Sequence, residues 1–227
     1  MSDFSENSEE LKALVTRIEQ KLDSKDSFYL DVEEICRVSN YYLEKGMTGK
    51  AMVVLKVGLN LHPVSSDIKL YLAQVHTANG EYKEALKYAE LTLSIEPNNV
   101  EVLILKAEIY SYLGDHKKSI QYYEDFLEKG DKRNLDLVYN DIAWEFESLM
   151  DYENALKYLK LALESNPGED TLLFEIAYFY EELNKHEECI EFYKKFLDEN
   201  PYSFNGWYNL GIVYNELKQY KKAVSAF

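Results

Sequence analysis

Apolar side chains recur along this chain at the spacing of an α-helix, in short runs that turn residues interrupt at regular intervals. The first run keeps one face of a helix that we expect to begin at Ser8 and to end near Leu22. Residues 1–7 are expected to be disordered and residues 24–27 to form a turn. Later runs predict helices over residues 28–45, 50–61 and 82–95. The pattern indicates an all-α chain of paired short helices behind one separate helix.

The four prolines fall at one phase of a 34-residue period. Pro63 and Pro97 are 34 residues apart, as are Pro167 and Pro201, and the gap between the two pairs is 70 residues, or two periods and two residues. Proline has no N–H to continue a helix, so it is expected where one helix has ended and another begins. The spacing therefore predicts an internal repeat rather than a bundle of unrelated helices.

Small residues recur at two phases of this repeat when position 1 is set at Val32, Ser66, Val100, Asp136, Asp170 and Phe204. Position 8 reads Ser39, Ala73, Ala107, Ala143, Ala177 and Gly211, and position 20 reads Ala51, Ala85, Ser119, Ala155, Cys189 and Ala223. Helices that cross closely need small side chains at the point of contact. Both phases are therefore expected to lie between the two helices of each repeat.

The last stretch of the chain resembles the tetratricopeptide repeat (TPR) family. It carries the family pattern W-x2-L-G-x2-Y…A-x3-F as Trp207, Leu210, Gly211, Tyr214, Ala223 and Phe227. The resemblance implies an all-α solenoid, a right-handed superhelix of helix–turn–helix repeats. Residues 1–31 would be a tail and a capping helix, and residues 32–227 the array. The repeats would be 32–65, 66–99, 100–135, 136–169, 170–203 and a shortened 204–227.

Position 15 of the repeat carries residues that tolerate the left-handed conformation which ends a helix, namely Gly46, Gly80, Gly114 and Asn184. Met150 and Lys218 depart from this pattern, so the sequence predicts those two turns less firmly. Residues 131–136 hold two extra residues, either a tolerated loop insertion or a change of curvature that divides 1–130 from 131–227. Lys69 and Lys106 fall at apolar positions and are expected to extend their ammonium groups toward solvent.

The chain is acidic, with a net charge of −16, which argues against binding nucleic acid or an anionic membrane surface. Its N-terminus has no signal-peptide pattern, and no apolar run approaches membrane-spanning length. Cys36 and Cys189 lie in distant repeats, so we expect no disulfide and a cytoplasmic setting.

The sequence shows no catalytic constellation and no metal or cofactor motif, so we expect a protein that is not an enzyme. His62, His76, His116 and His186 lack a second ligand at helical spacing, and neither a C-x2-C pair nor a glycine-rich phosphate loop occurs. At the same repeat position as tyrosines elsewhere, His116 and His186 are expected to pack between helices.

The family resemblance implies that positions 2, 5, 9 and 12 of each repeat line a concave groove. None of these 24 residues is Lys or Arg, so the basic carboxylate clamp of chaperone-binding family members is missing. Six are acidic: Glu33, Asp67, Glu101, Glu108, Glu147 and Glu181. The second half of the groove is aromatic and amide-rich, through Trp144, Phe174, Tyr178 and Tyr208 with Asn140, Asn205 and Asn215. The rings either bind a ligand or pack repeats together, and Trp144 is the strongest binding candidate.

We therefore expect a scaffold or adaptor that holds a neutral or basic peptide or protein in this groove. One alternative is a docking or regulatory region of a larger enzyme whose catalytic domain lies beyond Phe227. We also expect the natural chain to continue past Phe227, because Tyr220–Phe227 supplies only two turns of a second helix. Exposed apolar residues there would otherwise favour end-to-end self-association.

Overall fold

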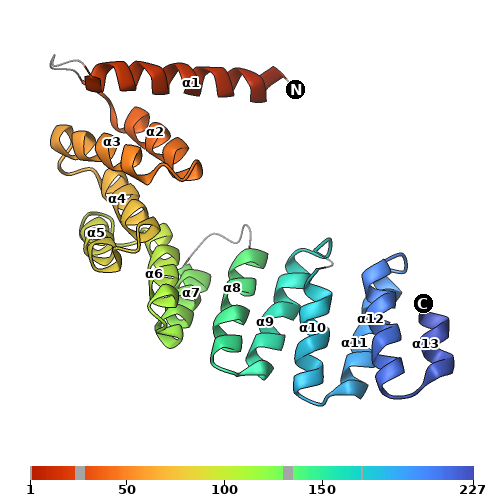
Figure 1. Ribbon diagram of the computed structural model, residues 1–227. Coiled ribbons are helices and arrows are strands. Elements are labelled where there is room, and N and C mark those ends of the chain that lie inside the picture. Colours follow the sequence, from red (N-terminus) through yellow and green to blue (C-terminus); the bar gives the residue numbers. More distant parts are fainter. Residues whose placement is uncertain (1, 24–28, 130–134, 170) are drawn as a thin grey trace. The chain divides into compact units, whose positions relative to one another are not determined.

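The computed structural model describes the backbone of residues 2–23, 29–129, 135–169 and 171–227. These ranges form helices and turns without a strand (Figure 1). The helices are α1 Ser2–Asp23, α2 Val32–Glu44, α3 Thr48–Leu61, α4 Ser66–Ala78, α5 Tyr82–Ile95, α6 Val100–Tyr112, α7 His116–Lys129, α8 Leu135–Ser148, α9 Tyr152–Ser165, α10 Leu172–Glu182, α11 His186–Glu199, α12 Phe204–Glu216 and α13 Tyr220–Ala226.

Two predicted boundaries near the N-terminus were wrong. Helix α1 begins at Ser2 rather than at Ser8, so the predicted disorder of residues 1–7 fails for residues 2–7. That segment contains neither glycine nor proline, and its acidic residues favour the first turns of a helix. Helix α2 does not start near Phe28 but at Val32, because the Asp31 carboxylate accepts a hydrogen bond from the Glu34 N–H at 2.8 Å and caps the helix there. The turn predicted at 24–27 and most of the 131–136 insertion lie outside the described residues.

The small residues lie between packed helices, as the repeat predicts. Position 20 is buried in all six repeats, and position 8 is buried in five, with Ala177 half-buried. Polar members share this burial: the hydroxyl oxygens of Ser39 and Ser119 are enclosed and have no hydrogen-bond partner. The small size of the side chain therefore decides which residue occupies these two positions, since a buried hydroxyl without a hydrogen-bond partner adds no stability.

In all six turns within the repeats, the residue at position 15 adopts the left-handed backbone conformation. At position 15, φ is +68° at Gly46, +73° at Gly80, +73° at Gly114 and +54° at Asn184. Met150 and Lys218, at which the sequence prediction was less firm, both have a φ of +58°. In five of these turns the next N–H donates to the carbonyl five residues back, for example Asp151 to Phe146 at 2.9 Å, and so closes the helix end. The backbone geometry of the turn is therefore the same in each repeat, although the amino acid at position 15 varies.

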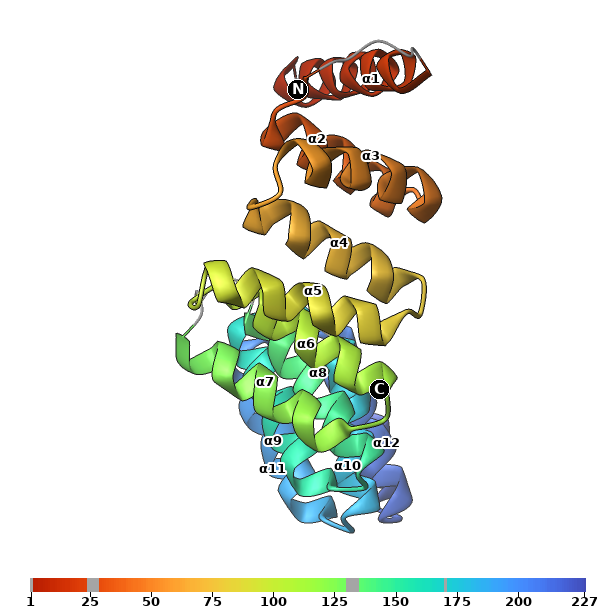
Figure 2. The ribbon, with the colours of Figure 1, turned by 90° about the vertical axis from the view of Figure 1, so that its left-hand side faces the viewer.

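The chain forms two compact units, residues 1–113 and 114–227. In the first unit α1 lies along α2 and covers the start of the repeats (Figures 1 and 2). Val15 and Ile18 of α1 join a core with Ile35 and Val38 of α2. The Tyr42 hydroxyl donates to Glu19 at 2.8 Å, and Lys50 pairs with the same carboxylate at 2.7 Å. Helix α1 is thus the predicted capping helix, fixed by both apolar and polar contacts.

Lys69 and Lys106 both belong to the first unit and keep their stems buried. The Lys69 ammonium donates to the carbonyls of Pro63 at 2.6 Å and Ser65 at 3.1 Å, and burial lowers the pKa of Lys69. The Lys106 ammonium pairs with Glu90 at 2.5 Å. Each lysine therefore carries its charge from an apolar position to an acceptor at the edge of the core.

The second unit alternates α8, α10 and α12 with α9, α11 and α13 as helical hairpins (Figure 1). Tyr193 of α11 is fully buried, and its hydroxyl donates to the Leu173 carbonyl of α10. Ile142, Leu159 and Ile176 are likewise fully buried. This packing holds α8, α10 and α12 as a row and fixes the face that carries the predicted groove residues.

Candidate peptide-binding surface

The predicted aromatic residues form a partly exposed surface on α8, α10 and α12. Trp144 on α8 is 60% exposed, and Phe174, Tyr178 and Tyr208 are 41–43% exposed. Tyr208 lies 6.5 Å from Phe174, ring centroid to ring centroid, which brings α10 and α12 together at this face. Packing between repeats therefore uses only part of each ring, and the remainder is available to a ligand.

Further rings extend this surface at both sides. Phe204 stacks on Tyr208 at 5.9 Å and remains 75% exposed, while Tyr152 at the start of α9 lies edge-on to Tyr178 at 6.4 Å. Neither residue occupies one of the four assumed groove positions. Phe204 could have been found from the sequence, because it is a large apolar residue at the first position of a helix, where burial is not expected. We define the aromatic face as Trp144, Phe174, Tyr178, Phe204 and Tyr208.

Carboxylates lie beside the aromatic face. Burial, followed by the charge of Glu147, raises the pKa of Glu175. Burial, followed by the charge of Glu181, raises the pKa of Glu216. These couplings link α8 to α10 and α10 to α12, so the predicted acidic residues Glu147 and Glu181 do lie near acids of the neighbouring helices. A cation placed here would relieve repulsion between like charges.

The three predicted asparagines differ in how they could meet a ligand. Asn215 is exposed, and Asn205 is half-buried. Asn140 is also half-buried, but its side-chain oxygen is enclosed and has no hydrogen-bond partner. A half-buried amide whose oxygen is unsatisfied can turn to place either its oxygen or its nitrogen toward a peptide.

In the first unit the predicted groove residues border a cavity between α4 and α6. Its volume is about 550 Å³, and its lining includes Gln74, Thr77 and Glu108, which are all predicted groove positions. Tyr112 also lines it and stacks on Tyr82, with ring centroids 5.7 Å apart. Tyr112 is not among the predicted groove residues, although it follows position 12 directly and is 66% exposed. Glu101 is exposed at the start of α6 but does not line this cavity.

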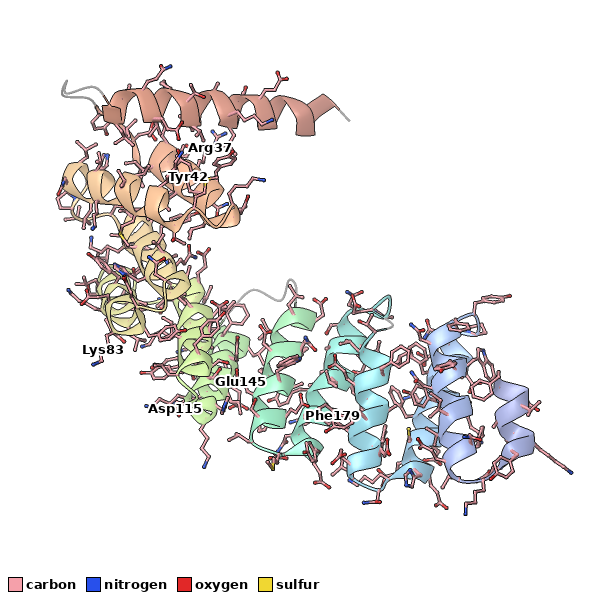
Figure 3. All side chains as sticks on the ribbon, in the orientation of Figure 1. Arg37, Tyr42, Lys83, Asp115, Glu145 and Phe179 are labelled. Carbon is pink, nitrogen blue, oxygen red and sulfur yellow. The ribbon has the colours of Figure 1, made fainter. Side chains whose placement is uncertain are left out.

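The histidines and cysteines take structural positions. His116 of α7 bonds through Nδ1 to the buried carboxylate of Glu145 on α8 at 2.7 Å, so it bridges helices as expected and adds a polar contact. Figure 3 labels the Glu145 side chain on α8. Burial raises the pKa of the Cys36 thiol, and also of the Cys189 thiol, to about 12. Among the described residues no group of three or more His, Cys, Asp and Glu side chains could hold a metal ion. Nor is any described helix long and apolar enough to cross a membrane.

Comparison with protein families matches three stretches of the chain to helical repeats. Residues 100–128 match the tetratricopeptide repeat, and residues 67–113 match the Fis1 C-terminal tetratricopeptide repeat. The chain is a tetratricopeptide repeat protein. In this TPR protein, residues 148–227 also match subunit 3 of the anaphase-promoting complex, or cyclosome. A sequence comparison with curated proteins gives no match.

Solved structures share the TPR fold at low sequence identity. PilF of Pseudomonas aeruginosa is 17% identical, with a TM-score of 0.62, and the match covers 86% of this chain and 87% of that chain. YrrB, described as a TPR protein with an unusual peptide-binding site, is 16% identical, with a TM-score of 0.56 and coverage of 76% and 88%. The Cut9–Hcn1 structure of the APC/C is 19% identical, with a TM-score of 0.57, and the match covers 94% of this chain but 41% of that chain.

Proposed function

We propose that this TPR protein is a non-enzymatic scaffold that binds a basic or neutral peptide on the surface of α8, α10 and α12 in the second unit. The observation that carries the proposal is the aromatic face, on which five rings from α8, α10 and α12 remain 41–75% exposed. Exposed aromatic clusters of this kind are typical of protein interaction surfaces. The peptide-binding site described for YrrB is consistent with such a role on the same fold.

The charge of the surface favours a basic ligand. The charge of Glu147 acts on Tyr178 and on Glu175, and the charge of Glu181 acts on Glu216; in both glutamates burial is the larger cause of the raised pKa. A cationic side chain would gain from these carboxylates and could also stack on a ring, for about 0.5–2 kcal/mol per ring contact. The acidic groups should speed association at low salt, and the rings should set the dissociation rate.

In the first unit, the cavity bounded by Gln74, Thr77 and Glu108 would by itself take a polar or basic group of a ligand. We include Glu101 as an outlying charge of that surface. Cytoplasmic localisation, end-to-end self-association and the role as a docking region of a larger enzyme stay predictions. The docking role would use the same aromatic face, so it does not change the experiment below.

A peptide library of graded charge tests the proposal against the full chain, Trp144→Ala, and a double variant carrying Glu147→Lys and Glu181→Lys. We expect basic peptides to bind most tightly and to lose affinity in both variants, with the loss in the double variant greatest at low salt. Tyr202→Ala removes a 97% exposed ring outside the aromatic face, and Glu187→Lys with Asp198→Lys makes the same charge change on α11. These controls should bind as the wild type does. A preference for acidic peptides, or equal binding by every variant, would overturn the proposal.

A further inference from the structure

A second cavity lies in the second unit between α9 and α11, away from the aromatic face. Its volume is about 780 Å³, larger than that of the α4–α6 cavity. Its walls include the rings of Tyr180, Phe192 and Phe196 together with Leu163 and Pro167. None of these residues belongs to the aromatic face or to the predicted groove positions. Peptide binding at α8, α10 and α12 therefore does not explain this cavity.

Charged residues surround the mouth of this cavity, and acids outnumber bases. The lining includes four glutamates and two lysines, and so has a formal charge of −2: Glu164, Glu188, Glu191, Glu199, Lys160 and Lys195. All four glutamates are exposed, which leaves their carboxylates at the rim and the rings below them. An acidic rim over an aromatic wall suits a cation that has an apolar or planar body.

An ammonium of the chain itself already uses the aromatic wall. Lys160 Nζ lies 4.6 Å from the Tyr180 ring centroid and 5.5 Å from that of Phe192. No described carboxylate forms an ion pair with it, so its contacts are with the rings. Burial lowers the pKa of Lys160, and the charge of Glu188 partly opposes that shift. This lysine is therefore a half-buried cation that lies over two rings and forms no ion pair with a described carboxylate, a position that a better-matched cation could take.

We propose that the α9–α11 cavity binds an arginine side chain of a partner protein, which displaces Lys160 from Tyr180 and Phe192. A guanidinium is planar, so it can stack on Phe192 while its N–H groups reach the carboxylates of Glu188 and Glu191. The displaced Lys160 regains water and has further carboxylates nearby, such as Glu164. The site is independent of the aromatic face, and the two could be occupied together.

The sign of one substitution distinguishes a cationic from an anionic ligand. Lys160→Met keeps most of the stem and removes the competing charge, so it should tighten arginine binding roughly two- to five-fold. If the lysine instead served to pair with a carboxylate of the ligand, the same substitution would weaken binding. Lys157→Met is the matched control, because Lys157 also lies over a ring, that of Tyr158 at 5.0 Å, but does not line the cavity.

The experiment uses acetyl-Leu-Arg-Leu-amide and acetyl-Leu-Glu-Leu-amide as probes at millimolar concentration, with the ring resonances of Phe192 followed by NMR in the full chain. We expect the arginine probe to shift Phe192, to bind more tightly to Lys160→Met, and to bind more weakly when Glu188→Gln and Glu191→Gln are combined. Glu187→Gln, on the same helix but outside the cavity, should have no effect. Trp144→Ala should also leave this binding unchanged, which separates the test from that of the aromatic face.

Three results would overturn the proposal. The first is that the arginine probe causes no shift of Phe192 in the wild type. The second is that Lys160→Met binds the arginine probe equally or less well while its thermal stability matches that of Lys157→Met. The third is that the glutamate probe binds the wild type and loses affinity in Lys160→Met, which would identify a carboxylate ligand instead.

Discussion

Replacing Met150 by glycine should stabilise the protein. Met150 holds a φ of +58° in the turn between α8 and α9, and its side chain is 77% exposed. The left-handed conformation costs a residue with a Cβ about 1–2 kcal/mol. Glycine removes this cost but makes the unfolded chain more flexible, which costs about 0.4–1 kcal/mol. Little apolar burial is lost, so the net gain should be about 0.5–1 kcal/mol.

Urea unfolding followed by circular dichroism measures this gain, and a thermal melt should shift upward by about 1–4 °C. The backbone N–H of Met150 donates to Glu147 O at 2.7 Å, and glycine retains that bond. Lys218→Gly, which has the same φ in the turn before α13, should give a similar gain. Gly80→Ala should lose a similar amount through its φ of +73° alone, because a Cβ added there meets no atom within 4 Å.

Two controls separate backbone strain from other effects of these changes. Met150→Ala removes the side chain but keeps the strain, so it should bring no gain. Lys194→Gly places a glycine at an exposed position inside α11 and should cost about 1 kcal/mol. If Met150→Gly destabilises the protein as much as Lys194→Gly does, or if Met150→Ala stabilises it equally, strain in the turn is not the cause.

Two further predictions concern packing and pH. Ala143 is 1% exposed, so Ala143→Leu should lower the free energy of unfolding by about 1–3 kcal/mol through overpacking. Ala177→Leu should lower it less, because Ala177 is half-buried. Equal urea midpoints for the two variants would contradict this prediction. Hydrogen bonds from Lys50 and then Tyr42 lower the pKa of Glu19, so the stability that this carboxylate adds is present above its unfolded pKa and is lost as pH falls through the lower folded pKa. The stability difference between wild type and Glu19→Gln should therefore shrink from about pH 7 to about pH 3, and a difference that does not change with pH would refute the link.

The repeat register could be read from the sequence because close helix contacts leave a periodic record of small residues. Ala73, Ala85 and their equivalents are buried where the 34-residue period places them. The turns at Met150 and Lys218 were less predictable, because the surrounding helices impose a φ that these residues do not themselves favour. The start of α2 was misplaced because Asp31 was not recognised as a cap.

The candidate sites were predictable only in part. The groove positions implied by the TPR resemblance include Trp144 and Tyr178, because the position of a residue along a helix decides which side chains share its face. They did not indicate Tyr112 or the α9–α11 cavity, because these depend on how neighbouring helices pack. They left out Phe204 because that residue lies at position 1, outside the four assumed groove positions. Nor could the sequence show that Lys160 occupies the rings of that cavity, since the residues involved come from three helices.

The repeated turn bond gives this protein a set of internal reporters for amide hydrogen exchange. The N–H groups of Met47, Glu81, Asp151, Lys185 and Gln219 donate at 2.8–2.9 Å to the carbonyl five residues earlier. These amides share one hydrogen-bond geometry, so once each rate is corrected for the neighbouring side chains, the remaining differences should reflect the opening of each hairpin. Because an array couples mainly nearest neighbours, the five rates would trace how far an opening at one hairpin spreads to the next.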